Sequence, residues 1–183
     1  WNYTFYVPHD IGGLARLMGG EKAFVTRLQS VFDLKRYDPA NEPDIAYPYL
    51  FSYYPEEAWR TQKEVRSLLE KQYTNKPDGI PGNDDTGTMS AWAVFSMMGF
   101  YPDIPGVPEY TLTTPAFERV VIRLDPRWHG RDSLVFETTA DPGSNPYTHS
   151  VKSGEKQLKG FRISHQELIR SGNLQFRVES RQK

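Results

Sequence analysis

Cysteine is absent from the 183 residues, and neither sign of charge is in excess. Twenty-two Lys and Arg stand against 23 Asp and Glu, which leaves a formal net charge of -1. The absence of cysteine excludes disulfide frameworks, thiol catalysis and thiolate metal sites. Near-neutral charge argues against a nucleic-acid or anionic-membrane partner, because such partners require a basic excess. No apolar run approaches the ~18 residues of a membrane span, so we expect neither nucleic acid nor membrane as a partner.

Aromatic residues and proline are the compositional features that stand out. Aromatics make up 14% of the chain, with 11 Tyr and 10 Phe, and there are 14 Pro. Hydrophobic residues at 38% and charged residues at 25% are typical of a folded globular chain. At roughly 100–200 residues per domain, this length allows one domain or two small ones and is enough for a buried core.

Residues 1–106 are predicted to be helical, with Pro and Gly at the breaks. Apolar side chains recur at helical spacing in four stretches, and a short aromatic segment separates the second from the third. The last stretch is apolar nearly all round, which is typical of a buried helix, and Gly99 is a natural residue to end it. The helical stretches are residues 11–18, 23–32, 56–73 and 88–98, and the aromatic segment is 47–54.

Residues 107–183 are predicted to form short strands. β-branched and aromatic residues gather in short runs separated by turn residues. Ser164 followed by Glu167 has the form of a capping box, so one helical turn should interrupt the strands. The boundary between the two parts falls within residues 102–109. The expected strands are residues 110–112, 120–124, 134–136, 161–163 and 174–178.

This layout indicates an α+β fold in which neither part is complete. About five helical segments make an incomplete helical barrel, and about five strands make one sheet with little to cover it. We therefore expect the chain to pack against a further, N-terminal portion of protein. The apolar faces of the strands should then lie against that portion.

Asn83, Asp84 and Asp85 come directly before the last predicted helix. The loop that leads to them, residues 75–82, contains two prolines and two glycines. Asp is a good N-cap and is favoured by the helix dipole, so capping is the simple structural interpretation. Capping accounts for one such residue but not for three in a row, and both a structural and a functional role stay open. The spacing does not fit an EF-hand calcium loop.

Two other polar clusters are candidates. Asn41 and Glu42 lie in the segment Asn41-Glu42-Pro43-Asp44, whose oxygens suit calcium or sugar hydroxyls but are also ordinary in a capped turn. His9 and Asp10 could act as a general base or bind a metal, although a histidine beside an aspartate more often caps a helix.

No nucleophile elbow, phosphate loop or dinucleotide fingerprint occurs in the chain. What remains is a set of aromatic residues near loop carboxylates in a frame of helical hairpins. Aromatic faces stack on sugar rings, and paired carboxylates cleave glycosidic bonds. The composition therefore favours an enzyme that acts on carbohydrate.

Six motifs along the chain occur in the order found in one enzyme family. They are Val7-Pro8-His9-Asp10, Leu17-Met18-Gly19-Gly20, Asn41-Glu42-Pro43, Trp59-Arg60-Thr61-Gln62, Gly82-Asn83-Asp84-Asp85-Thr86-Gly87 and Gly99-Phe100-Tyr101-Pro102. Together they closely resemble glycoside hydrolase family 92, the calcium-dependent exo-acting α-mannosidases. The resemblance begins at Trp1, continues into the last predicted strands and so covers nearly the whole chain.

The resemblance implies a fold, an activity and partners. Members have an N-terminal β-sandwich, a catalytic (α/α)6 barrel and a C-terminal β segment. Residues 1–106 would be the C-terminal part of the barrel, and residues 107–183 a small antiparallel β segment that packs on the missing N-terminal portion. The activity would be inverting hydrolysis of terminal α-mannosyl residues of glycans or mannans with Ca²⁺, in a secreted or extracellular enzyme. The linkage preference is not implied.

The resemblance also assigns residues. Asp85 matches the catalytic general base, and Asn83 stands where many members have a second aspartate that helps to hold the water. Asn41 and Glu42 match the motif that lines the mannose and calcium site, and both are expected as calcium ligands. The substrate-binding residues would be Asn41, Glu42, His9, Asp10 and Asp84. The general acid is expected in a Glu-x-x-x-Trp pattern whose Trp is Trp1, ahead of this chain.

Two alternatives stay open at this stage. The chain could belong to a non-catalytic carbohydrate-binding or interaction module that keeps the scaffold, although such a module has no need of a general base at Asp85. It could also belong to a glycosidase of a different (α/α) barrel family.

Overall fold

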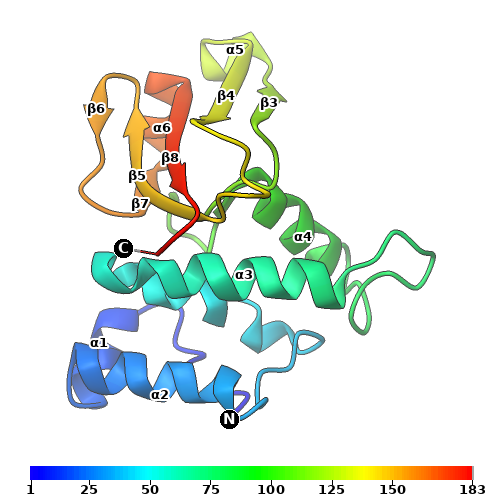
Figure 1. Ribbon diagram of the computed structural model, residues 1–183, viewed down its shortest axis with the longest axis vertical. Coiled ribbons are helices and arrows are strands. Elements are labelled where there is room, and N and C mark those ends of the chain that lie inside the picture. The colour runs from blue at the N-terminus through cyan, green and yellow to red at the C-terminus, as the bar shows by residue number, and fades with distance from the viewer. Residues whose placement is uncertain (183) are drawn as a thin grey trace.

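The N-terminal half of the chain is helical, as expected from its apolar periodicity. The computed structural model describes residues 1–182 (Figure 1). The α-helices of this half are α1 (Ile11–Leu17), α2 (Glu21–Asp33), α3 (Ala58–Gln72) and α4 (Thr88–Met98). Three short 3-10 helices lie between α2 and α3, namely η1 (Glu42–Asp44), η2 (Tyr47–Tyr53) and η3 (Pro55–Glu57). The aromatic segment is thus helical, but in the tighter 3-10 form.

The end of α4 follows the sequence prediction. Gly99 has a φ of 93°, the left-handed conformation that glycine adopts without steric cost, and its N–H donates to the carbonyls of Phe95 and Ser96. A Cβ on Gly99 would lie 2.6 Å from Cγ of Pro115. Both the turn and the close packing therefore require glycine here.

The C-terminal half forms two sheets. The strands are β1 (Phe100–Tyr101), β2 (Glu109–Leu112), β3 (Arg119–Arg123), β4 (Ser133–Thr138), β5 (Tyr147–Ser153), β6 (Lys156–Gln157), β7 (Arg162–Ser164) and β8 (Asn173–Glu179). Strands β1, β2 and β7 form one sheet, and the other has the order β3-β4-β8-β5-β6. Two short helices, α5 (Pro126–His129) and α6 (His165–Ser171), join strands. Ser164 Oγ accepts the N–H of Glu167, so the predicted capping box begins α6.

The expectation of a purely antiparallel β segment is wrong at one pair. Strand β4 runs parallel to β8, with Phe136 opposite Leu174, whereas the other pairs are antiparallel. The long connection from β4 to β8, which includes β5, β7 and α6, permits this parallel pairing. The mixed sheet results from a contact between strands far apart in the sequence.

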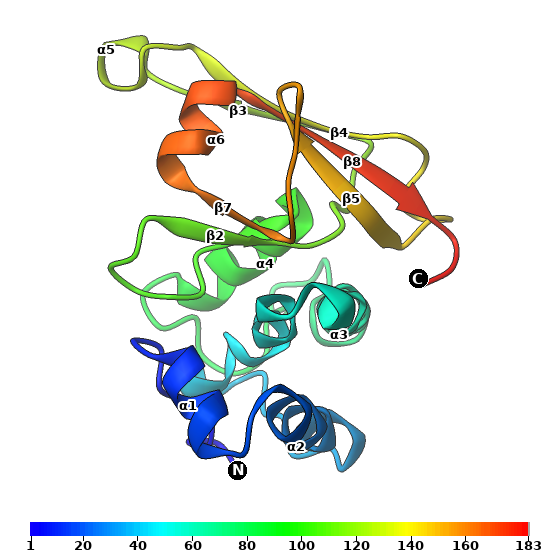
Figure 2. The ribbon, with the colours of Figure 1, turned by 90° about the vertical axis from the view of Figure 1, so that its left-hand side faces the viewer.

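Much of the apolar surface of the strands is covered within the chain, although Val121 of β3 is 45% exposed. The packing of this segment on a further, N-terminal portion of protein stays a prediction. Helix α6 lies between the two sheets (Figure 2). The resulting core draws on both sheets, on α6 through Leu168 and on α3 through Ala58. Its other buried members are Phe100, Leu112, Leu134, Phe136, Val151, Phe161, Ile163, Leu174, Phe176 and Val178.

The helical half has its own apolar clusters. Phe5 and Phe24 meet edge to face with ring centres 5.3 Å apart, and they join α2 to the N-terminal segment. A second cluster forms around Trp92 of α4, Tyr49 of η2 and Val65 of α3. These contacts fix the three elements that carry the candidate site.

The helical half and the larger sheet are joined by direct hydrogen bonds. Gln62 of α3, 2% exposed, donates from Nε2 to the carbonyl of Thr148 at 2.9 Å and accepts the Thr148 N–H at 3.0 Å. Strands β1 and β2, which lie before and after the predicted boundary, pair with each other. The division into domains at residues 106 and 107 stays a prediction.

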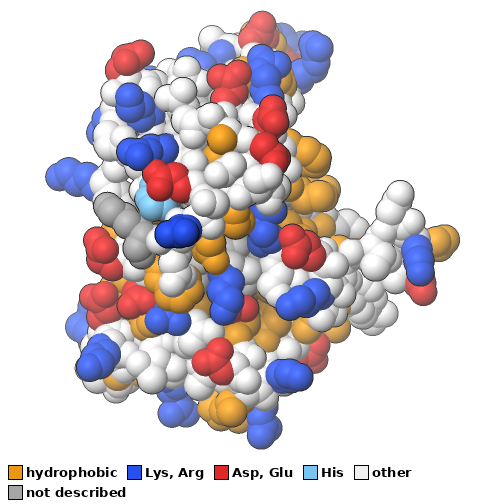
Figure 3. Space-filling model, in the orientation of Figure 1, with side chains coloured by type: hydrophobic (Ala, Val, Ile, Leu, Met, Phe, Trp, Pro, Cys, Tyr) orange, Lys and Arg blue, Asp and Glu red, His pale blue; other side chains and the backbone are white. Residues whose placement is uncertain are grey.

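Charged side chains of both signs are interspersed over the face seen in Figure 3, as the near-neutral composition suggests. None of the helices within residues 1–182 has the length and apolar character needed to cross a membrane.

Candidate functional site

The loop between α3 and α4 brings Asn83, Asp84 and Asp85 to the start of α4. It extends beyond the end of α3 (Figure 1). The Thr74 N–H donates to the Gly79 carbonyl at 2.9 Å, and a Cβ on Gly79 would lie 2.0 Å from the Thr74 oxygen. The two sides of the loop are therefore in close contact at its base.

The N-cap position of α4 is Gly87, and Asp84, three residues before it, supplies the side-chain acceptor that caps the first turn. Its Oδ1 accepts the N–H of Ser90 at 2.8 Å, and its carbonyl accepts the N–H of Met89 at 3.1 Å. Both N–H groups belong to the first turn of α4, where no helical carbonyl can reach them. The structural interpretation of the acidic tripeptide therefore applies to Asp84.

Asp85 is held by its backbone and leaves its carboxylate exposed. Its carbonyl accepts the N–H of Thr88 at 3.2 Å and the Thr88 hydroxyl at 2.7 Å. Asp85, Thr86 and Gly87 all have positive φ, at 48°, 60° and 91°. The β-branched Thr86 is a true outlier in this region, and such strain costs about 1–3 kcal/mol per residue. No side chain of residues 1–182 engages the Asp85 carboxylate by hydrogen bond or ion pair.

Asn83 is exposed, and the loop places it beside the Asn41 segment. A Cβ on Gly82 would lie 2.7 Å from Cβ of Ala40, so the residues that precede Asn83 and Asn41 are in direct contact. In addition, the Trp92 indole N–H of α4 donates to the Ile45 carbonyl at 2.8 Å, which ties α4 to the end of η1. The two motifs, about forty residues apart in the sequence, thus lie side by side.

Within the second motif, Asp44 is the buried carboxyl group. Asp44 is fully buried, and its oxygens accept the Asn41 amide N–H at 3.1 Å and the Asp38 backbone N–H at 3.3 Å. Burial raises the pKa of Asp44 to about 6, although these two hydrogen bonds oppose the shift. Asp44 fixes the amide of Asn41, while the neighbouring Glu42 is exposed.

Glu42 borders a small cleft with aromatic walls. The cleft has a volume of about 90 Å3, and Tyr6, Pro8 and Tyr101 are among its lining residues. The Tyr101 ring stacks on Tyr49 with ring centres 4.7 Å apart. Burial, and after it the nearby Asp103 carboxylate, raises the pKa of Tyr101 above its usual range, so its hydroxyl stays protonated. The cleft can offer a ring face, a phenol and a carboxylate to a ligand.

His9 and Asp10 lie next to this cleft, between its lining residues Pro8 and Ile11. Asp10 Oδ1 accepts the N–H of Gly13 at 2.7 Å and caps α1, which is the structural interpretation of this pair. His9 is exposed. A contact of either residue with substrate stays a prediction.

Calcium would find few protein ligands in this chain. Among residues 1–182, no three His, Cys, Asp or Glu side chains come together as a metal site. The carboxylate of Glu42 is exposed, and Asn41 uses its Nδ2 for Asp44, which leaves its amide oxygen to accept. Both are hard oxygen donors, so they fit a part of the six to eight oxygens that calcium takes.

Two residues of the site were not assigned a role from the sequence. Tyr101 lies in the quoted motif Gly99-Phe100-Tyr101-Pro102, and only the structure shows that it lines the cleft and stacks on Tyr49. Tyr73 stacks on Trp92, and burial raises its pKa to about 12, with a smaller effect from the Asp84 carboxylate. Aromatic residues at the ends of helices are the signal that the sequence offered for both.

Comparison with known proteins gives consistent matches over almost the entire chain. Residues 1–180 match the family model described as the glycosyl hydrolase family 92 catalytic domain. A protein of Arthroderma benhamiae called an uncharacterized secreted glycosidase is 31% identical over 176 residues, which are 96% of this chain and 22% of that protein.

Solved structures match in fold as well. A family GH92 α-mannosidase from Bacteroides thetaiotaomicron is 28% identical, with a TM-score of 0.85, over 98% of this chain and 24% of that one. It has also been solved in complex with mannoimidazole. A family GH92 inverting mannosidase from the same organism is 29% identical, with a TM-score of 0.86, over 99% of this chain and 27% of that one. The chain thus spans about a quarter of the length of these relatives.

Proposed function

The chain belongs to glycosyl hydrolase family 92, and from this premise we propose that it is the part of a calcium-dependent, inverting exo-α-mannosidase that carries the general base. The observation that supports this most directly is Asp85. Its carboxylate is exposed and unpaired within residues 1–182, on a strained turn whose backbone is bound to α4. Strain of this kind is concentrated at functional sites.

Asp85 would remove the proton from the attacking water. In an inverting glycosidase the two carboxyl groups stand roughly 6.5–9.5 Å apart, with a water between the base and the sugar. The N-terminus of α4 favours an anionic group at Asp85, because the helix dipole is positive at that end. Asn83, exposed on the same loop, would orient the water through its amide.

The general acid would come from protein beyond these residues. The family resemblance places it four residues before Trp1, and the relatives are about four times as long as this chain. The remainder of the enzyme would thus be a required partner of this chain, and α-mannoside glycans its substrate. The family and the described relative from Arthroderma benhamiae support a secreted or extracellular enzyme.

The terminal mannose would bind at the cleft beside Glu42. Tyr6 and Tyr101 supply aromatic walls, and Glu42 and Asn41 supply oxygens that can accept from hydroxyl groups. We assign Glu42 and Asn41 as the ligands that this chain would give to Ca²⁺, which as a Lewis acid would bind and orient the hydroxyls of the sugar. His9 and Asp10 lie at the edge of the same cleft and would contact the sugar from there.

The alternative function is a non-catalytic carbohydrate-binding module on this scaffold. The aromatic cleft suits either function. The exposed Asp85 carboxylate on its strained turn favours the enzyme, because a binding module does not need a general base. The two are distinguished by following the hydrolysis of an aryl α-mannoside by the full-length enzyme with NMR before mutarotation. Release of β-mannose first supports the proposal. Release of α-mannose first contradicts inversion, and the absence of hydrolysis with a folded protein supports the binding module.

A further inference from the structure

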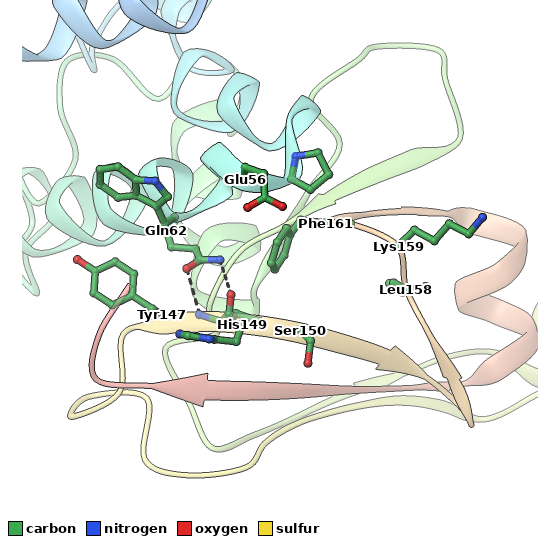
Figure 4. Close-up of a pocket in the computed structure, with 12 residues that line it drawn as sticks. Glu56, Gln62, Tyr147, His149, Ser150, Leu158, Lys159 and Phe161 are labelled. Carbon is green, nitrogen blue, oxygen red and sulfur yellow. Dashed lines mark hydrogen bonds between the residues drawn. The ribbon is translucent and has the colours of Figure 1, made fainter. Parts of the chain in front are cut away.

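A second cleft lies at the other end of α3, away from Asp85. It is bordered by η3 and the first turns of α3 on one side, and by β5 and the segment 158–161 on the other. Its volume is about 190 Å3. Figure 4 shows its lining, with Tyr147 at one end, Lys159 at the other, and Glu56 and Phe161 between them. Pockets for drug-sized ligands hold ~300–1,000 Å3, so this cleft has room for a smaller group such as one sugar ring.

The floor of this cleft is preformed. Gln62, whose two bonds to the backbone of Thr148 are drawn in Figure 4, fixes β5 against α3. The Thr148 hydroxyl is bonded in turn to that of Thr114 at 2.9 Å. The register of β5 with β8 shifts between Thr148 and Ser150, which makes His149 the extra residue of a β-bulge. Bulges re-aim side chains and are frequent next to binding sites.

The walls combine aromatic rings with polar groups that have no partner. Trp59, Tyr147 and Phe161 contribute rings. Within the part of the chain that the structure describes, neither the Glu56 carboxylate nor the Tyr147 hydroxyl has a hydrogen-bond partner. A sugar presents an apolar C–H face to a ring and hydroxyl groups to polar atoms at its edge. The cleft therefore has the two kinds of surface that a sugar requires.

A cationic ligand suits the cleft less well, although rings and a carboxylate attract cations. The guanidinium of Arg60 already lies 4.4 Å from the centre of the Trp59 ring. Glu57 Oε2 and Gln29 Oε1 accept hydrogen bonds from that guanidinium at 2.6 Å and 2.9 Å and hold it there. Arg60 thus already covers the Trp59 ring as a cationic ligand would. Lys159, which lines the cleft, would also repel a second positive charge, whereas it would not repel a neutral hydroxylated ring.

The distance from Asp85 separates this cleft from the candidate active site. Helix α3 has 15 residues, Glu56 and Trp59 lie at its start, and the Asp85 loop follows its end. At 1.5 Å per residue, the helix alone spans roughly 22 Å. One sugar unit cannot occupy both places, but one polymeric or branched chain can contact both.

We propose that this cleft is a second carbohydrate-binding site, which holds one sugar unit of a mannan or glycan at a distance from the bond that is cleaved. The position of this second site does not depend on the proposed function. The assignment of its ligand as a carbohydrate rests on the proposed function. Such a site would raise the affinity of the enzyme for polymeric substrate and leave its action on a small substrate unchanged, because only the polymer can reach both clefts.

The test is affinity electrophoresis of the full-length enzyme in gels that contain soluble α-mannan, combined with hydrolysis of an aryl α-mannoside. Tyr147→Ala and Glu56→Gln should each weaken retardation by mannan about three- to tenfold. This is the change in affinity expected from the loss of one ring contact or one hydrogen bond. The kcat/KM for the aryl mannoside should not change. Trp128→Ala is the matched control, since Trp128 of α5 is 81% exposed and lies outside the cleft.

Equal retardation of the wild type and both variants would overturn the proposal. A lower melting temperature with unchanged retardation would also overturn it, because the cleft would then be filled by protein. If Tyr147→Ala fails to fold, the retardation of Glu56→Gln alone tests the proposal, because Glu56 is exposed and its substitution should not disturb the fold. Should the enzyme hydrolyse no mannoside, the proposed function fails, while the retardation still tests the cleft.

Discussion

Asp84 accepts the backbone N–H of Ser90 at 2.8 Å, and this single bond distinguishes it from its neighbour Asp85. The two carboxylates are adjacent in the sequence, but that of Asp84 is bound to the helix, whereas that of Asp85 has no partner among residues 1–182. The bond of Asp84 orients the turn in which Asp85, Thr86 and Gly87 have positive φ. Asp84 therefore belongs to the support of the site, and its expected contact with substrate stays a prediction.

Substitutions of Asp84 should distinguish its role in capping α4 from any effect of its negative charge on the substrate. Asp84→Asn keeps an oxygen for the Ser90 N–H, so the melting temperature should stay close to that of the wild type. Asp84→Ala removes the cap and should lower the free energy of unfolding by about 0.5–2 kcal/mol. The measurements are thermal unfolding and kcat of the full-length enzyme. A loss of kcat in Asp84→Asn as large as in Asp85→Asn would show that the charge of Asp84 acts on the substrate.

Asp85→Asn should abolish most activity and leave the fold intact. The amide cannot take a proton from water, and loss of a general base costs about 10²–10⁴-fold in rate. The exposed side chain makes no contact that the fold needs, so the melting temperature should not change. Asn83→Ala, which removes only the orienting amide, should have a smaller effect on kcat than Asp85→Asn.

The absence of a covalent intermediate provides a second check on the role of Asp85. In an inverting enzyme the second carboxylate never attacks carbon, so no glycosyl-enzyme intermediate should accumulate in the wild type or in Asp85→Asn. Near-normal kcat in Asp85→Asn would remove this residue from the role of base.

The local features of the fold could be predicted from the sequence. The apolar periodicity of α4, its end at Gly99 and the capping box of α6 all depend on residues a few positions apart. The parallel pairing of β4 with β8 could not be predicted, because it joins strands far apart in the chain. Strand β5 was not expected at all, since its polar residues Thr148, Ser150 and Lys152 hide the alternation.

The site could be predicted in its parts but not in its arrangement. The motifs around Asn41 and Asn83 were identified separately, and only the contact of Gly82 with Ala40 shows that they adjoin. The burial of Asp44 depends on how η1 packs on α4, and this packing cannot be predicted from the residues near Asp44 in the sequence. For the same reason, the sequence could not decide which acid of the loop caps α4.

Asp44 should make stability depend on pH. Its pKa is 3.8 when unfolded and about 6 when folded, so between these values the folded state binds the proton and the unfolded state does not. The contribution of Asp44 to stability is then greatest below pH 3.8 and falls as the pH rises to about 6, by roughly 3 kcal/mol at most. Asp44 should therefore lower the melting temperature of the full-length enzyme, measured in a chelator, as the pH rises across this range.

The Asp44→Asn variant isolates this effect. Its amide does not titrate, so the part of the decline that is due to Asp44 should vanish, while other carboxyl groups contribute equally to both proteins. The two proteins are compared by how steeply the melting temperature changes with pH, not by its absolute value. The absolute value will differ because the single amide oxygen of Asn cannot accept both hydrogen bonds that Asp44 accepts. Identical slopes would mean that Asp44 titrates near its usual pKa.

Glu42→Gln should weaken the dependence of the full-length enzyme on calcium. The wild type should lose activity in a chelator and regain it with Ca²⁺ rather than Zn²⁺, because the available donors are hard oxygens and the chain has no cysteine. The amide of Gln is a weaker calcium ligand than a carboxylate, so a higher Ca²⁺ concentration should be needed to restore half of the activity. KM for an aryl α-mannoside should rise in parallel.

Glu21→Gln is the matched control, because Glu21 is an exposed carboxylate at the start of α2 and does not line the cleft beside Glu42. It removes the same charge from the protein and should leave the calcium response unchanged. If Glu42→Gln and Glu21→Gln need the same Ca²⁺ concentration to regain half of their activity, Glu42 is not a calcium ligand. If Glu42→Gln raises KM but leaves the calcium response intact, the carboxylate contacts the sugar directly and calcium is held by other residues.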